Sequence, residues 1–148
     1  MADTNLQTRD LVRAYHAAWT GGEINAGGQY LADDFTTRAP VGSYDTKDAY
    51  LTGLTRFRSL VGGLDLISEL YGDDEAMLLY DVHTNTPAGK LRTAEHFRVR
   101  EGQIASTLLV FDATDWKAML ATQGATVDAE GHVTRPAPAN HPTASNTA

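Results

Sequence analysis

The sequence predicts a single α+β domain in which helices cover the concave face of a strongly curved antiparallel sheet. Three helical patterns come first and a run of strand patterns follows, without the strand–helix alternation that is typical of a parallel sheet. Glycine pairs and Gly-Asp turns separate these segments. A sheet of this kind would close a cone-shaped pocket beneath the helices.

The composition is that of one globular domain: 148 residues, of which 42% are hydrophobic and 21% are charged. A net charge of −7 argues against a nucleic-acid partner, because the phosphate backbone would be repelled. No apolar run approaches the roughly 20 residues of a membrane span, and the N-terminus has no signal pattern. We therefore expect a cytoplasmic protein without a membrane partner. Cysteine is absent and the five histidines show no metal-ligand spacing, so no metal site is predicted.

Two helices are predicted before the first strand. Residues 4–7 have the form of a capping box, and apolar side chains keep helical spacing from Leu11 to Trp19, before Gly21 and Gly22 end the helix. A weaker helix is predicted over residues 25–32, since each glycine of its Gly27-Gly28 pair costs roughly 1 kcal/mol relative to alanine. Residues 33–34 would then turn the chain into a strand at 35–39.

A third helix is predicted from Asp45 or Thr46 up to the glycine pair at 62–63, with its apolar stripe at Tyr50, Leu51, Leu54, Phe57 and Val61. The period then changes to two, which indicates strands at 64–71 and 76–84. A short helix capped within residues 112–115 follows the last strand. From Asp128 the composition lacks periodicity, so we expect a domain over residues 1–127 and a disordered tail over 128–148.

The stretch 91–111 is predicted to be a hairpin that turns at residues 100–102. A three-residue loop with Gly102 in the left-handed conformation would set Glu95 opposite Thr107, with Leu109 and Phe111 on the same face. A two-residue loop would set Leu108 opposite Glu95 instead. We favour the three-residue loop.

Glu95 is the one charged residue on an otherwise apolar strand face, where Leu91, Thr93, Phe97 and Val99 alternate with it. A buried carboxylate is costly unless it is protonated, paired or used in chemistry. Glu95 is therefore either a general acid or base with a raised pKa, or a carboxylate paired with an arginine. Its neighbours offer no positive charge, which favours the raised pKa.

Three other ionisable residues are given structural explanations rather than catalytic roles. Asp81 and Arg92 are expected to pair across neighbouring strands, outside the pocket. His16 lies about 100° around its helix from Tyr15 and is expected to be exposed.

Residues 13–43 resemble the ketosteroid isomerase branch of the nuclear transport factor 2-like superfamily, which also contains SnoaL-like polyketide cyclases and limonene epoxide hydrolases. The shared features are an Arg-x-Tyr-x-Ala-Ala run from Arg13, a Gly-acidic pair, an Ala-Asp-Asp run and a strand ending in Pro-Val-Gly-Ser. Glu95-His96-Phe97-Arg98 stands where the isomerases have Asp-His-Phe-Arg. The resemblance covers about residues 5–122 and implies the cystatin-like, ketosteroid isomerase-like cone.

The isomerases use a tyrosine and a protonated aspartic acid as an oxyanion hole, and a second aspartate moves the proton. The resemblance places Tyr15 at the tyrosine and Glu95 at the oxyanion-hole acid. Ala39 stands at the position of the proton-moving aspartate. The chain thus keeps the electrophilic half of such a site and lacks its usual base. Tyr15 has a second interpretation, as a core aromatic whose hydroxyl is satisfied by a neighbour.

Two functions remain open. The first is a cofactor-independent isomerase, cyclase or hydrolase that acts on a small hydrophobic carbonyl, enol or epoxide compound, with Tyr15 and Glu95 as its catalytic residues. The second, supported by Ala39, is a non-catalytic small-molecule-binding or assembly module. Leu108 and Val110 make the outer sheet face apolar, and the resemblance implies a homodimer there. The side chains expected to line the pocket are Trp19, Phe35, Ala39, Phe57, Tyr80, Val82, Phe97, Thr107, Leu109 and Phe111.

Overall fold

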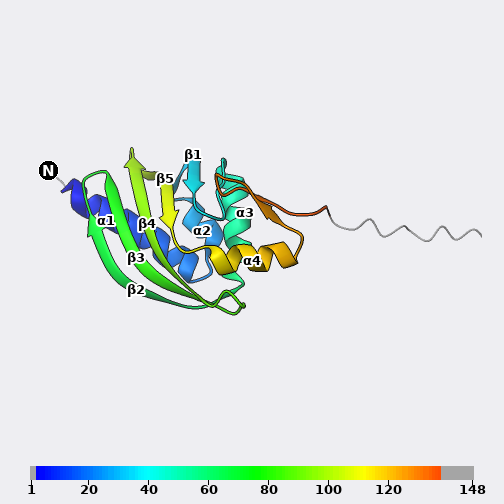
Figure 1. Ribbon diagram of the computed structural model, residues 1–148. Coiled ribbons are helices and arrows are strands. Elements are labelled where there is room, and N and C mark those ends of the chain that lie inside the picture. Colours follow the sequence, from blue (N-terminus) through cyan, green and yellow to red (C-terminus); the bar gives the residue numbers. More distant parts are fainter. Residues whose placement is uncertain (1–2, 138–148) are drawn as a thin grey trace, which may run out of the picture.

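The computed structural model describes residues 3–137, which form a curved sheet with helices packed on its concave side (Figure 1). The helices are α1 (Thr4–Thr20), α2 (Ile24–Gly28), α3 (Lys47–Arg58) and α4 (Thr114–Thr122). The strands are β1 (Leu31–Arg38), β2 (Val61–Tyr71), β3 (Glu75–Thr84), β4 (Lys90–Arg100), β5 (Gln103–Val110), β6 (Thr126–Val127) and β7 (Val133–Thr134). Between residues 3 and 137, no helix combines the length and the apolar character that a membrane crossing requires.

The main sheet has the strand order β1-β5-β4-β3-β2. Three of its four pairings are antiparallel, as the order of elements predicts, whereas β1 joins β5 in parallel. The two-stranded sheet of β6 and β7 is separate. The predicted fold class is therefore confirmed.

Three predicted boundaries were wrong because strand pairing prevails over local turn signals. Asp33 and Asp34 do not turn the chain but lie inside β1, where both are exposed at the edge of the sheet. Arg100 donates a hydrogen bond of 2.6 Å to Asp34. The third helix ends at Arg58 rather than at the glycine pair, since Val61 and Gly63 already pair with β3. The weaker second helix likewise ends early, at Gly28.

The β4–β5 hairpin has the two-residue loop that we did not favour. Glu101 and Gly102 both have positive φ, of 53° and 76°, which matches the type I′ turn of a tight hairpin. A bulge then shifts the register beside Val99, so that Glu95 faces Leu109 and Phe97 faces Thr107. Neither predicted register is present, yet Thr107 and Leu109 keep the face of Glu95, because the bulge restores the alternation that the shorter loop would have reversed.

Two of the simpler assignments had different outcomes. The pair of Asp81 and Arg92 is confirmed, with two hydrogen bonds of 2.8 and 3.0 Å. The expectation that His16 is exposed was wrong, because its side chain is only 8% accessible. Its ring packs between the rings of Trp19 and Tyr80, at centroid distances of 5.5 and 5.2 Å, because α1 crosses the concave face closely enough to bury this side of the helix as well.

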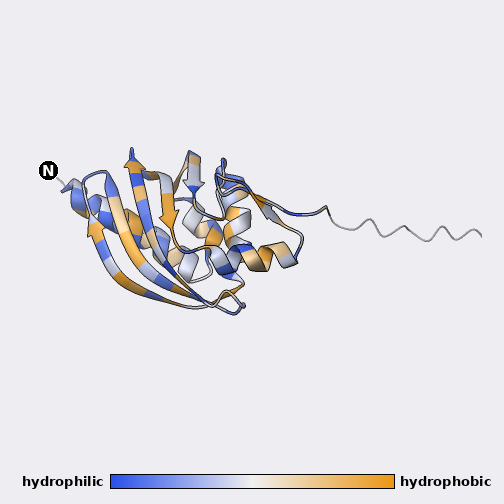
Figure 2. Cartoon of the chain, in the orientation of Figure 1, coloured by the Kyte–Doolittle hydropathy of each residue, from blue (hydrophilic) through white to orange (hydrophobic). Residues whose placement is uncertain are grey.

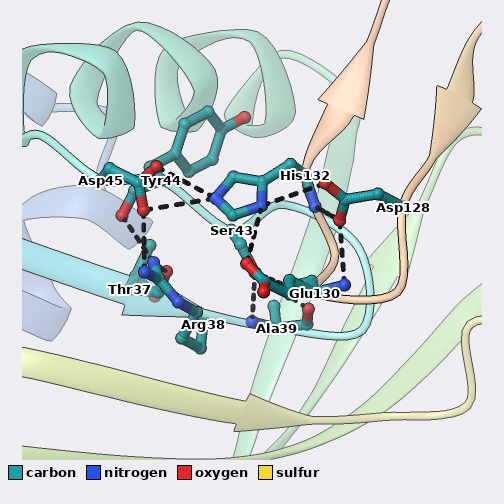
Figure 3. A network of polar contacts seen from close by, with 9 residues as sticks. All are labelled: Thr37, Arg38, Ala39, Ser43, Tyr44, Asp45, Asp128, Glu130 and His132. Carbon is teal, nitrogen blue, oxygen red and sulfur yellow. Dashed lines mark hydrogen bonds and ion pairs between the residues drawn. The ribbon is translucent and has the colours of Figure 1, made fainter.

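Residues 126–137 form a C-terminal strap that lies against the loop after β1. The carbonyl oxygen of Gly131 accepts hydrogen bonds from the backbone N–H groups of Gly42 and Ser43, and the Ser43 hydroxyl donates to the carbonyl of Glu130 at 2.6 Å. Figure 3 shows the contact of Ser43 with Glu130 together with His132, whose Nε2 lies 3.2 Å from Asp45. Gly131 has a φ of 88°, and a Cβ there would lie 1.9 Å from the oxygen of Ala39, so the docking requires glycine.

The expectation of a disordered tail from Asp128 is therefore wrong for residues 128–137; residues 138–148 lie outside the described part of the chain. The strap is held largely by backbone hydrogen bonds at Gly131 and Ser43. Such contacts leave no apolar periodicity, which is why the composition alone suggested disorder.

Truncation after Val127 is expected to lower the melting temperature by roughly 5 °C, because it removes hydrogen bonds that together contribute on the order of 2 kcal/mol. Truncation after Ala137 is the matched control, since it leaves every contact of the strap described above in place. Differential scanning calorimetry of both variants tests this. Equal melting temperatures for the two would show that the strap adds nothing to stability.

Candidate functional site

A cavity of about 360 Å³ lies between the concave sheet face, α3, α4 and the strap. This volume is within the usual range for sites that bind small molecules. Its wall is mainly apolar and aromatic. The lining residues are Trp19, Thr37, Ala39, Val41, Gly42, Tyr44, Tyr50, Gly53, Leu54, Arg56, Phe57, Leu60, Tyr80, Val82, Leu91, Thr93, Glu95, Leu109, Phe111, Trp116, Leu120, Val133 and Arg135.

Most of the side chains expected in the pocket line this cavity: Trp19, Ala39, Phe57, Tyr80, Val82, Glu95, Leu109 and Phe111. The other four do not, because they pack behind its wall. The rings of Phe35 and Tyr50 lie 4.9 Å apart, and those of Phe97 and Tyr15 meet edge-on at 6.1 Å, both distances measured between ring centroids. Thr107 exchanges a hydrogen bond of 2.7 Å with Thr37, which occupies the wall in its place.

Glu95 projects from the middle of β4 into the cavity and is 2% accessible. Tyr80 donates a hydrogen bond of 2.7 Å to Glu95 Oε1, and no residue of the described chain donates to Oε2. Burial raises the pKa of Glu95 to about 7, although the bond from Tyr80 lowers it. No arginine pairs with this carboxylate within residues 3–137, so the alternative of a structural ion pair is not what the site contains.

The tyrosine that bonds Glu95 is Tyr80 and not Tyr15. The Tyr15 hydroxyl shares a hydrogen bond with the Tyr50 hydroxyl, and only Tyr50 of this pair lines the cavity. Burial raises the pKa of both, and the negative charge of Glu95 raises them further. Burial raises the pKa of Tyr80 as well, so all three hydroxyls keep their protons at neutral pH.

Ala39, which stands at the base position of the resembled isomerases, lines the cavity with its methyl group. The Ser43 hydroxyl accepts from its backbone N–H at 3.0 Å, so this part of the wall is held by the loop after β1. Glu95 is the one acidic side chain that lines the cavity in the described residues. Over the same residues, His, Asp and Glu do not gather into a group of three that could hold a metal ion.

His16 packs against the ring of Tyr80 but does not itself line the cavity. Burial lowers the pKa of its imidazole to about 4, against a smaller opposing effect of the Glu69 charge. Neither ring nitrogen has a hydrogen-bond partner among residues 3–137. The ring is therefore a neutral packing element at neutral pH, and its protonation would place an unpaired charge in the core.

The sequence contained a signal for the Tyr80–Glu95 contact that we did not use. The predicted pairing of Asp81 with Arg92 fixes the β3–β4 register, and Tyr80 then follows as the diagonal neighbour of Glu95 on the concave face. Tyr50 was recognised only as part of the apolar stripe of its helix. No periodic signal marked Val133 and Arg135, because the strap is not amphipathic.

A cone-shaped α+β fold with an acid at the floor of an apolar cavity defines a ketosteroid isomerase-like protein of the nuclear transport factor 2-like superfamily. The chain belongs to the SnoaL-like domain family, whose model matches residues 12–107.

Solved structures agree with this assignment. A protein from Kribbella flavida DSM 17836 is 29% identical, with a TM-score of 0.69 over 78% of this chain and 94% of that one. A candidate ketosteroid isomerase from the same organism is 20% identical, with a TM-score of 0.61 over 72% and 78% of the two chains. A candidate polyketide cyclase from Xanthomonas campestris pv. campestris is 20% identical, with a TM-score of 0.62 over 78% and 98%. The last two show likeness of fold. No curated protein matches the chain.

Proposed function

We propose that this protein is a cofactor-independent enzyme that acts by acid–base catalysis on a small hydrophobic carbonyl, enol or epoxide compound. Isomerisation, cyclisation and hydrolytic ring opening are the reaction types that the family assignment and the site support. The observation that carries the proposal is Glu95, a carboxyl group with a pKa of about 7 that faces an apolar cavity. A catalytic acid or base works best when its pKa lies near the working pH.

In this proposal Glu95 replaces the missing aspartate at Ala39 as the group that moves the proton. Its ionised form removes a proton from carbon beside a carbonyl group, or from water, and its protonated form returns the proton elsewhere. Oε2 is the atom with this role, since Oε1 accepts from Tyr80. Proton transfer by a positioned carboxyl group typically contributes a factor of about 10² to 10⁴ in rate.

Tyr50 is the donor proposed for the negative charge that develops on the substrate oxygen, because this residue lines the cavity and its hydroxyl is hydrogen-bonded to that of Tyr15. Tyr15 is then a positioning residue that acts through Tyr50. Donors fixed in a site from which water is excluded stabilise such charge more strongly than water does.

Deuterium exchange tests the proposal without knowledge of the natural substrate. Small hydrophobic ketones are incubated with the protein in D₂O, and incorporation at the carbon beside the carbonyl is followed by NMR. We expect exchange with a pH inflection near 7, set by Glu95. A panel of hydrophobic epoxides is tested in parallel. Binding of these compounds without exchange or ring opening would contradict the enzyme and favour the alternative.

That alternative is a non-catalytic module that binds a small hydrophobic molecule or serves assembly. The observation in its favour is Ala39, which leaves the cavity with one carboxyl group where the resembled isomerases use two. An open cavity lined by Trp19, Phe57 and Phe111 suits either function.

We also propose that the protein is a homodimer through the outer face of its sheet. Leu108 and Val110 are 51% and 62% exposed there, and Leu70 and Met77 continue this apolar surface across the paired strands. Figure 2 shows hydrophobic residues along β3 and β5. Exposed apolar patches of this kind mark interaction surfaces.

Sedimentation at micromolar concentration is expected to give the mass of a dimer, and the double variant Leu108→Glu/Val110→Glu is expected to give a monomer. The reason is that the two charges would have to be buried in the interface without partners. A monomeric parent protein would contradict the proposal.

A further inference from the structure

The arginines of this chain fall into two groups by what they contact. Six of the nine form ion pairs: Arg9, Arg13, Arg38, Arg92, Arg98 and Arg100. Arg58 donates to the backbone carbonyls of Thr20 and Val61. The side chains of the remaining two, Arg56 and Arg135, make no hydrogen bond or ion pair to any residue between 3 and 137, and both line the cavity.

This placement is unusual in a chain with 19 acidic and 12 basic residues, where a carboxylate partner is available for most cations. Arg56 and Arg135 come from separate elements, the last turn of α3 and the end of the strap. Both are exposed, whereas Glu95 is buried. Two positive charges therefore stand at the open end of the cavity and a carboxyl group stands at its closed end.

Between these ends the wall is apolar. The apolar lining includes Leu54 and Phe57 on α3, Leu60 after it and Trp116 on α4. The cavity thus offers a cationic entrance, a hydrophobic middle and a proton-transfer group at the floor. A guanidinium group binds a carboxylate through two parallel hydrogen bonds, which is the reason arginine is preferred for planar anions.

We propose that the ligand of this cavity is an amphipathic acid: a hydrophobic body that carries a carboxylate, held at the entrance by Arg56 and Arg135, with its opposite end at Glu95. The orientation follows from burial, because a carboxylate at the floor would lose its hydration beside Glu95, whereas the two cations that line the cavity are both exposed. The preference for a carboxylate follows from the cavity alone. Whether the opposite end of the ligand then reacts at Glu95 rests on the proposed function.

The chain offers an internal reporter, since both of its tryptophans, Trp19 and Trp116, line the cavity. We would titrate 4-cyclohexylbutanoate and its amide, which have the same shape, no ultraviolet absorbance and different charge, and follow tryptophan fluorescence at pH 6.5. We expect the carboxylate to bind roughly fivefold more tightly than the amide, as two exposed ion pairs would give. High salt should remove most of this difference.

The variant Arg56→Gln/Arg135→Gln is expected to lose the preference, with carboxylate affinity falling to that of the amide and amide affinity unchanged. Arg9→Gln/Arg100→Gln is the matched control, because it also removes two positive charges, from arginines that pair with Asp10 and Asp34 and do not line the cavity. It should keep the preference. Glu95→Gln should keep it as well while losing deuterium exchange, so that failure of the ligand class and failure of the reaction are distinguishable.

Three results would overturn the proposal. One is equal affinity of the parent protein for the carboxylate and the amide, and another is absence of saturable binding of the carboxylate. The third is a preference for the carboxylate that survives in the Arg56→Gln/Arg135→Gln variant.

Discussion

Replacing Glu95 with glutamine is expected to lower turnover by a factor of about 10² to 10⁴, while ligand affinity stays within roughly tenfold. The amide keeps the shape of the side chain and can still accept from Tyr80, but it cannot exchange a proton. The effect should therefore appear in kcat and not in KM. Steady-state kinetics on any compound that shows exchange or ring opening provides the measurement.

Two tyrosine variants sharpen this test. Tyr15→Phe should cost less than Glu95→Gln, because it removes one donor behind Tyr50 and leaves the proton carrier in place. Tyr80→Phe should move the pH inflection above that of the parent, since the Tyr80 hydrogen bond lowers the pKa of Glu95. A Glu95→Gln variant as active as the parent protein would refute the assignment of the proton carrier.

The free energy of unfolding is expected to depend on pH in two opposed ways, one set by His16 and the other by Glu95. Burial holds the pKa of His16 at about 4, below its ordinary 6.5, and raises that of Glu95 to about 7 from 4.5. Between pH 4 and 6.5 the unfolded chain binds a proton at His16 that the folded chain does not, so stability rises with pH. Between pH 4.5 and 7 the folded chain binds a proton at Glu95 that the unfolded chain does not, so stability falls with pH.

The two slopes overlap from pH 4.5 to 6.5 and should largely cancel in the parent protein. Each group contributes up to roughly 3 kcal/mol across its window. Glu95→Gln is therefore expected to show stability that rises with pH up to 6.5, and His16→Leu stability that falls from pH 4.5 to 7. Urea unfolding at a series of pH values measures both, and the double variant should show neither slope. If Glu95→Gln and His16→Leu showed the same dependence of stability on pH, the assignment of the two slopes to these residues would be contradicted.

The acid at the centre of the site could be predicted from sequence because strand alternation is a local pattern, and Glu95 interrupts an apolar face. Its partner could not be fixed in the same way. Which residue faces Glu95 depends on a bulge beside Val99 and on the loop at residues 101–102, and each of these shifts the register by one position. The resemblance pointed to Tyr15, but the packing of α1 directs that hydroxyl to Tyr50 instead.

The C-terminal wall of the cavity was missed for a different physical reason. Sequence periodicity reveals segments that bury an apolar stripe, whereas the strap docks through the carbonyl oxygen of Gly131 and the hydroxyl of Ser43. Contacts of this kind depend on a conformation with positive φ at one residue, and glycine alone does not reveal whether that conformation is used. Burial of His16 was likewise a matter of how closely α1 crosses the sheet.

The cavity is assembled from two stretches of sequence that could be exchanged separately. The match to the SnoaL-like family covers residues 12–107 and includes Glu95, Tyr80 and Tyr50, but six lining residues come after it: Leu109, Phe111, Trp116, Leu120, Val133 and Arg135. A recombinant that carries the last forty residues of another family member would keep the proton-transfer group and Arg56, and would receive new residues in place of the other six. The strap is therefore the natural place to redirect this scaffold toward other ligands, by design or by gene fusion.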